Sequence, residues 1–287
     1  MHLLTNSVYD LYDLWRHRDK LGSHLLFKTI EYRRLKKFKN LHQGVKRCFV
    51  IGNGPSIKQQ NLTLLRNEYT FATNFFVLHE DFEEINLKYL CLSNPKFWRK
   101  GTLPSSVLQV LHEHPELITF FEHTFLAVNQ RQRLLDRKRC YYVYLDYKHP
   151  VFEGHVSLDP ARRTHHGHTV IIDLCLPLAY YMGFEEVYLL GCDCDYGLDE
   201  APDYSKAYFY PIQEQEAAPD SASYLTDRWV RNVFNSYSTI KKTFETHDRK
   251  IYNATHGGKL EVFPRVNFED VLGLNRGSND EGTEWKK

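Results

Sequence analysis

The sequence predicts an α/β fold in which one mainly parallel sheet is covered by helices on both faces. Short apolar segments of strand length alternate with longer segments of helical periodicity through most of the 287 residues. Polar turn residues follow several of the apolar segments directly, and this is where ligands bind to parallel sheets. A chain of this length forms one large domain, alone or with a smaller appendage.

The first 46 residues are predicted to form a basic helical extension. Lysines and arginines outnumber acidic residues there, and leucines and aromatic residues recur at roughly helical spacing. Two interpretations are equally open, a helix packed on the core and an amphipathic surface that docks on anionic lipid headgroups. A nucleic-acid arm is a distant third.

The strand candidates follow in order through a nucleotide-binding domain predicted over residues 47–274. Each is a short run of apolar and aromatic residues bounded by turn-forming residues. Helical stretches fall between several of them, notably 169–182 and 229–247. The polar tail, 275–287, is predicted to be disordered. The strand candidates are 48–51, 70–73, 89–92, 118–121, 141–144, 187–190 and 251–253.

Composition predicts a cytoplasmic globular protein. The six cysteines lie mostly in apolar runs and form no C-x-x-C pair, so neither structural zinc nor thioredoxin-like chemistry is expected. No signal peptide and no apolar run long enough to span a bilayer occur in the sequence. The net charge of +1 gives no argument for a nucleic-acid partner.

The segment Gly52-Asn53-Gly54-Pro55-Ser56, directly after the first strand, predicts a phosphate or nucleotide site. Two glycines let the backbone turn tightly near a ligand, proline suits a first helical turn, and free N–H groups there attract anions. The segment lacks the third glycine of the dinucleotide fingerprint and the Gly-Lys-Ser/Thr ending of the P-loop. An ordinary strand-to-helix connection explains it equally well when it is taken alone.

Polar residues also follow the next two strands. Asn74 comes after the second, and Ser93 with Asn94 after the third. An asparagine side chain offers both a donor and an acceptor to a base or ribose. Turn preference accounts for any single asparagine, but three after successive strands favour a bound nucleotide.

Together with the segment from Gly183-Phe-Glu-Glu-Val to Gly191-Cys-Asp193, these motifs resemble those of bacterial sialyltransferases that act on lipooligosaccharide. They are at least as similar to the wider family of polysaccharide-biosynthesis and motility-accessory-factor proteins with a hydroxymethylpterin diphosphokinase-like domain. The resemblance spans roughly residues 48–272. It implies a Rossmann-like domain and a glycosyltransferase that uses a nucleotide-sugar donor, with a CMP-sugar favoured, in surface polysaccharide or lipopolysaccharide biosynthesis.

The resemblance also implies roles for individual residues. The three asparagines would lie along the cytidine monophosphate, and Arg162 or Arg163 would be the family's arginine ahead of the 169–182 helix. Tyr196 and Tyr204 would hold the leaving phosphate, so that no metal cofactor is required. The implied partners are the donor, a glycan or lipid-linked acceptor and, through the basic extension, an anionic inner-membrane surface.

The general base is not assigned by the sequence. The family's base is a histidine ahead of the last long helix, where this chain has Trp229-Val-Arg231. A histidine titrating near neutrality can deprotonate a sugar hydroxyl directly. The candidates are His165, His166, His168, His256, Asp193 and Asp195.

Other interpretations stay open. The pair Asp193 and Asp195 would hold Mn²⁺ or Mg²⁺ if the donor were a nucleoside diphosphate sugar. The chain would alternatively be an ATP-dependent pterin diphosphokinase-like enzyme, or a non-catalytic nucleotide-binding module of a glycan-assembly complex. The turn at Gly257-Gly258, followed by Lys259, is either an acceptor or phosphate contact or a plain surface turn. The aromatic stretch 204–210 is predicted to lie in a long loop that acts as a lid.

Overall fold

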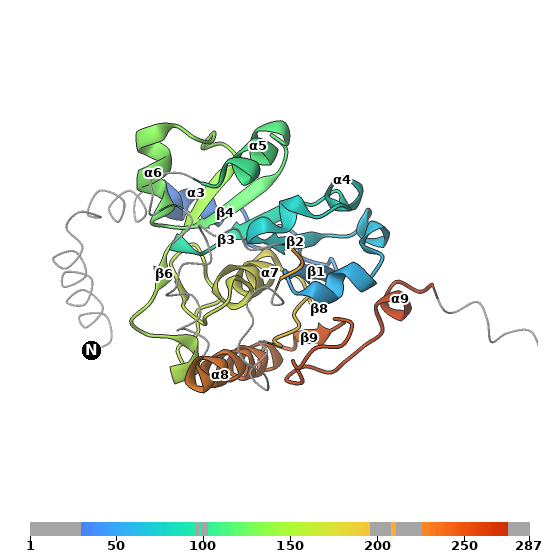
Figure 1. Cartoon of the computed structure of the whole chain (residues 1–287). Coiled ribbons are helices and arrows are strands. Elements are labelled where there is room, and N and C mark those ends of the chain that lie inside the picture. The colour runs from blue at the N-terminus through green and yellow to red at the C-terminus, as the bar shows by residue number, and fades with distance from the viewer. Residues whose placement is uncertain (1–29, 96–97, 99–102, 196–207, 211–225, 275–287) are drawn as a thin grey trace, which may run out of the picture.

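The computed structural model describes residues 30–95, 98, 103–195, 208–210 and 226–274. Its centre is a seven-stranded parallel sheet with the order β5-β4-β3-β2-β1-β8-β9 (Figure 1). All seven predicted strands are present in it, which confirms the predicted fold class. The strands are β1 (Arg47–Ile51), β2 (Thr70–Thr73), β3 (Tyr89–Leu92), β4 (Ile118–Glu122), β5 (Cys140–Val143), β8 (Glu186–Leu190) and β9 (Lys250–Asn253).

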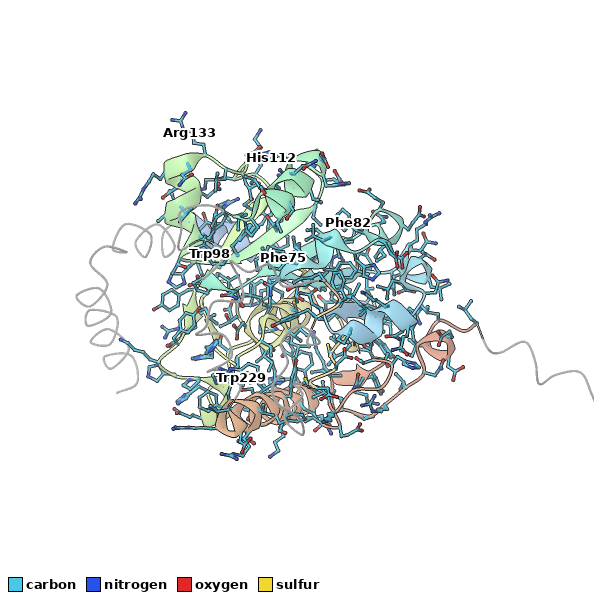
Figure 2. The ribbon with its side chains drawn as sticks, in the orientation of Figure 1. Phe75, Phe82, Trp98, His112, Arg133 and Trp229 are labelled. Carbon is cyan, nitrogen blue, oxygen red and sulfur yellow. The ribbon has the colours of Figure 1, made fainter. Side chains whose placement is uncertain are left out.

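Helices cover both faces of the sheet because its central strands are apolar on both sides. Four of the five residues of β1 and all four residues of β2 and β3 are buried. One face packs against α3 (Tyr32–Lys36), the π-helix η8 (Ile171–Cys175), α7 (Leu176–Met182) and α8 (Asp227–Glu245). The other packs against η3 (Pro55–Gln59), η4 (Leu62–Leu65), η5 (Asn74–Leu78), α4 (Phe82–Ile85), α5 (Ser105–Glu113), α6 (Phe125–Gln132) and α9 (Phe268–Val271). Side chains fill both layers (Figure 2).

The chain reverses its direction of sheet growth between β1 and β8. It adds β2 to β5 outward on one side of β1 and then returns to place β8 and β9 on the other. A small parallel pair, β6 (Leu145–Asp146) and β7 (Thr164–His165), and the turn η7 (Val151–Glu153) lie in the connection. Because ligands bind to such sheets where the strand order reverses, a ligand site is expected at the carboxyl ends of β1 and its neighbours.

The predicted helix over 169–182 begins as a π-helix and continues as α7. The Leu176 N–H donates to the carbonyl of Ile171, five residues earlier. Pro177 has no N–H to bond the carbonyl of Asp173, so the wider turn costs no α-helical hydrogen bond at that point. Such π turns are frequent at functional sites, and this one holds a buried carboxylate.

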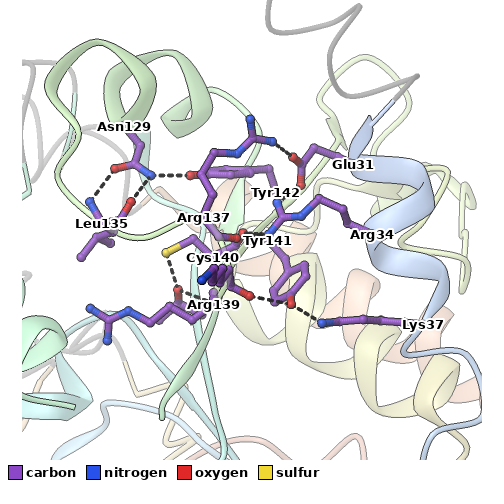
Figure 3. A network of polar contacts seen from close by, with 12 residues as sticks. Glu31, Arg34, Lys37, Asn129, Leu135, Arg137, Arg139, Cys140, Tyr141 and Tyr142 are labelled. Carbon is purple, nitrogen blue, oxygen red and sulfur yellow. Dashed lines mark hydrogen bonds and ion pairs between the residues drawn. The ribbon is translucent and has the colours of Figure 1, made fainter. Parts of the chain in front are cut away.

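The described part of the basic extension packs on the domain. Leu35 and Phe38 are fully buried in the core of the α7 and α8 face. Buried Glu31 pairs with Arg34 and Arg137, and Arg34 also donates to the carbonyl of Cys140 at 2.9 Å (Figure 3). For residues 31–46 the packed interpretation therefore holds, whereas residues 1–29 and the tail lie outside the described residues. None of the described helices is long and apolar enough to cross a membrane.

Candidate functional site

The two glycines after β1 are required by contact with the loop after β8. A Cβ on Gly52 would lie 2.4 Å from the carbonyl oxygen of Gly191, and one on Gly54 would lie 1.7 Å from Oδ2 of Asp193. The Gly54 N–H donates to the Gly191 carbonyl at 2.9 Å. The glycines therefore let two loops of the protein approach each other at the point where strand order reverses.

The sequence predicts an anion bound at the first turn after β1, and in the structure the carboxylate of Asp193 occupies that position. Its carboxylate accepts from the Ser56 N–H at 3.2 Å and from Ser56 Oγ at 2.8 Å, and Pro55 opens the 3₁₀-helix η3. Burial raises the pKa of Asp193, and the Ser56 hydrogen bonds partly offset this. These donors, assigned to a ligand phosphate by the sequence argument, are thus satisfied within the protein.

The carboxylate of Asp195 has a different partner from that of Asp193. Asp195 forms an ion pair with Lys259, with its Oδ1 3.2 Å from Nζ. Asp193 and Asp195 thus have separate partners. Within the described ranges, no group of three or more His, Cys, Asp or Glu side chains is arranged to hold a metal ion.

The asparagines after β1 and β2 each carry a buried polar atom without a hydrogen-bond partner among the described residues. Asn53 is buried and donates from Nδ2 to the Thr73 carbonyl at 3.0 Å, which joins the ends of the two strands. Asn74 has the left-handed φ of 46°. The Oδ1 atoms of both side chains are buried and accept no hydrogen bond from any described residue. A buried acceptor left unsatisfied costs about 1–3 kcal/mol, so two that follow adjacent strands indicate a site that a donor group completes.

A buried carboxylate lies beyond the end of β3. Asp173, in η8, accepts from the Gly167 N–H at 2.7 Å and from Ser93 Oγ at 3.1 Å, and its Oδ2 lies 3.3 Å from Nδ1 of His166. Asp173 is 2% exposed, whereas the His166 side chain is 24% exposed. Ser93 was predicted to line the site, and its hydrogen bond to Asp173 connects the end of β3 with His166. Asn94, the next residue, is half-buried.

His168 has a different environment from His166. Its ring stacks on Phe152 with centroids 5.1 Å apart and lies 4.7 Å from the His166 ring. Burial lowers the pKa of His168 to about 4, with a further contribution from His166. Its Nε2 is buried with no hydrogen-bond partner in the described part of the chain, and its φ is 72°. His168 is therefore neutral near pH 7, has a strained backbone, and packs its ring against that of His166.

The remaining predicted catalytic residues are spread over several places. Arg163 pairs with Asp146, at 3.3 Å, in the connection that contains β6 and β7. His165 Nδ1 lies 2.7 Å from the carbonyl oxygen of His149. His256 is exposed at the turn after β9. Tyr196 and Tyr204 lie outside the described residues.

The turn Gly257-Gly258 is built into the fold. Both glycines have positive φ, and the Arg265 guanidinium donates to the carbonyls of Thr255, Gly257 and Gly258 at 3.3, 2.6 and 2.9 Å. The Lys259 N–H donates to the Asp193 carbonyl at 2.6 Å. The turn therefore buttresses the Asp193 loop.

Part of the aromatic stretch lies against the asparagine edge. The Phe209 N–H donates to the Asn53 carbonyl at 2.9 Å, and its buried ring packs against Phe76 and His79. Tyr210 packs against Phe75, which is labelled in Figure 2, with centroids 5.1 Å apart. Residues 208–210 of this stretch thus lie against the strand end that carries Asn53.

Sequence reasoning did not find Asp173. The only sign was a single carboxylate within the apolar run 170–182, since a buried charge needs partners. Comparison of the chain with protein-family models, with curated proteins and with solved structures finds no significant match.

Proposed function

We propose that the protein is a glycosyltransferase that takes a nucleotide-sugar donor, a CMP-sugar in particular, and transfers the sugar to a surface glycan or lipid-linked acceptor. The observation that carries this proposal is a pair of buried amide oxygens, those of Asn53 and Asn74, which accept no hydrogen bond from a described residue and follow adjacent strands. They lie beside the reversal of strand order, where nucleotides bind to sheets of this kind.

The chemistry of these atoms favours the nucleoside part of a ligand. Both are acceptors, so they need donors, and a phosphate has none at neutral pH. The exocyclic amine of cytosine and the hydroxyls of ribose do donate. Since Asp193 occupies the donors of Ser56, the edge formed by Asn53 and Asn74 is the better place for base and ribose.

The proposal needs no metal at the aspartate pair. Asp193 is bound to Ser56 and Asp195 to Lys259, so the two carboxylates are not poised to chelate together a metal ion that would hold a diphosphate. Tyr196 and Tyr204 stay the proposed holders of the leaving phosphate, from the family resemblance alone. A lipid-linked acceptor would place the enzyme on the cytoplasmic face of the inner membrane.

Thermal shifts with CMP, UDP, GDP and ATP, each with and without Mn²⁺ or Mg²⁺, test the proposal. A ligand at 100 times its Kd stabilises the native state by about 2.7 kcal/mol. We expect CMP to give the largest shift, without metal, and Asn74→Ala to abolish most of it. Asn86→Ala is the matched control, because Asn86 also has a left-handed φ, 55°, but is exposed after α4.

Two outcomes would count against the proposal. A larger shift with ATP and Mg²⁺ than with CMP would favour the diphosphokinase alternative. An Asn74→Ala variant that keeps the full CMP shift would show that the nucleotide does not bind at this edge.

A further inference from the structure

We propose that His166 is the general base that activates the acceptor hydroxyl, and that Asp173 is the residue that positions it. This inference rests on the proposed function and deepens it, because neither the sequence nor the resemblance assigns the base. It is carried by the contacts of the Asp173 carboxylate and by the different exposures of the two side chains.

Asp173 is held in a single place by donors from two directions. Oδ1 accepts from the Gly167 N–H at 2.7 Å, and Oδ2 accepts from Ser93 Oγ at 3.1 Å. Oδ2 also lies 3.3 Å from His166 Nδ1. A carboxylate fixed in this way selects the tautomer with the proton on Nδ1, so that Nε2 presents its lone pair away from the carboxylate.

The different exposures of His166 and Asp173 indicate which of the two can contact the substrate. Asp173 is 2% exposed and out of reach of a sugar, whereas the His166 side chain is 24% exposed. The pair is anchored to Ser93, at the end of β3. Asn74 follows the adjacent strand β2, and adjacent strands are about 4.8 Å apart. The base is thus anchored to the strand that neighbours β2, at the same carboxyl margin of the sheet as the edge proposed for the nucleoside.

The backbone around the pair is specialised for this contact. The π turn carries Asp173, and left-handed His168 follows Gly167, whose N–H points at the carboxylate. A Cβ on Gly167 would lie 2.3 Å from Cγ2 of Ile172, so only glycine fits there. Strained residues and π turns persist where the surrounding structure fixes them, and they gather at functional sites.

The other candidates for the base lack this arrangement. His168 has its Nε2 buried, and His165 faces a backbone carbonyl. His256 is exposed on its turn and has no carboxylate partner among the described residues. Asp193 accepts from the Ser56 backbone and side chain, and Asp195 forms an ion pair with Lys259.

The charges around His166 suit a base. Burial lowers its pKa, but Asp173 and then Glu122 raise it by more, so the pKa is above the ordinary value. The groups that face it are Asp173, Glu122, the His168 ring and the ring of Tyr147, 4.9 Å away. Asp173 also stabilises the imidazolium that forms during the reaction.

The acceptor hydroxyl gives its proton to His166 Nε2 while its oxygen forms a bond to the anomeric carbon of the donor. The bond from that carbon to the phosphate oxygen breaks, and its electron pair leaves on CMP. The imidazolium then loses its proton to water.

The test compares the full-length wild type with His166→Gln, Asp173→Asn and the control His155→Gln, since His155 is exposed in the same connection. CMP release from CMP-sialic acid is measured with a panel of saccharide acceptors, alongside the CMP thermal shift. We expect His166→Gln to lower kcat about 10²-fold or more and to keep the CMP shift, while His155→Gln changes neither.

The pH profile separates positioning from a structural role. The base works unprotonated, so kcat/KM rises with pH through the pKa of His166. Asp173→Asn removes the main group that raises this pKa, and the rise moves to lower pH. Ser93→Ala removes a hydrogen bond that spreads the negative charge of the Asp173 carboxylate, so His166 faces more of that charge and the rise moves to higher pH. This variant also tests the proposal if Asp173→Asn does not fold.

The possible failures are distinguishable. A wild type with neither a CMP shift nor transfer would overturn the proposed function and this inference with it. A wild type that transfers while His166→Gln keeps most of its kcat, or pH profiles that do not move in opposite directions, would overturn this inference alone.

Discussion

Replacing Gly54 by alanine should destabilise the protein because its new methyl group collides with Asp193. Backbone conformation is not the reason, since Gly54 has φ −64° and ψ 150°, which alanine adopts freely. The Cβ would lie 1.7 Å from Asp193 Oδ2 and 2.7 Å from the Gly191 carbonyl oxygen. The closer contact is with a side chain that a second substitution can remove.

The two substitutions should therefore be coupled. Overpacking a buried site costs roughly 1–3 kcal/mol, and we expect Gly54→Ala to cost about 3 kcal/mol. Asp193→Ala deprives the Ser56 N–H and hydroxyl of their acceptor, which costs about 2 kcal/mol. Independent effects would give about 5 kcal/mol. The double variant should lose only about 3 kcal/mol, because the larger collision is gone.

Urea unfolding followed by circular dichroism gives the four free energies of unfolding for this cycle. The control cycle pairs Gly54→Ala with Asp195→Ala, whose carboxylate is half exposed and faces Lys259. We expect the control to be additive. Additivity in the Gly54 and Asp193 cycle as well would refute the view that these two loops, and not a ligand, require the glycine.

Three further outcomes are expected. Phe38→Ala should cost about 3–5 kcal/mol of unfolding free energy, since Phe38 is buried against Phe120 and Tyr141, whereas Leu41→Ala, at a side chain 51% exposed, should cost less than about 0.5 kcal/mol in the same urea experiment. Burial lowers the pKa of His168 from 6.5 to about 4, so below pH 6.5 the unfolded state binds a proton at this residue more readily than the native state. The native state should therefore lose about 3 kcal/mol of stability as the pH falls from above 6.5 toward 4. His168→Asn should reduce the fall in the urea midpoint between pH 7 and pH 4.5, and an equal fall in both proteins would disprove this account. Arg265→Ala should speed amide hydrogen exchange at Lys259 by loosening the turn that holds it, and unchanged protection would show that the turn is stable without the guanidinium.

The sheet could be predicted from the sequence because each strand is a short apolar run that ends in turn residues. For the N-terminal segment the sequence left two interpretations open, a helix packed on the core and a surface for anionic lipid. The partners of Arg34 and Lys37, which decide between them, lie about a hundred residues later, at Arg137, Cys140 and Tyr141. Basic charge and helical spacing do not reveal such partners, since both patterns are also those of a surface helix.

The candidate site was predictable at the asparagines and less so elsewhere. Asn53 and Asn74 were found because they follow adjacent parallel strands, and the edge of a sheet brings such positions together. The local sequence predicted that Gly54 and Ser56 contact a ligand. In the structure the carboxylate of Asp193, 137 residues after Ser56, lies against Gly54 and accepts the hydrogen bonds of Ser56. The pairing of His166 with Asp173 depends on a π turn, which the helical periodicity of the sequence does not predict.

The contact between Arg34 and Cys140 has a consequence for solubility. The carbonyls of Arg139 and Val143 face β4, so the alternation of a parallel strand turns the Cys140 carbonyl toward the open side of β5, an outermost strand of the sheet. An open strand is a template for pairing with another chain, and the Arg34 guanidinium covers this one. At the opposite margin, residues 264–266 pair with Asn253 of β9. Deletion of α3 would therefore do more than weaken the core, because it would expose β5 to strand addition and self-association.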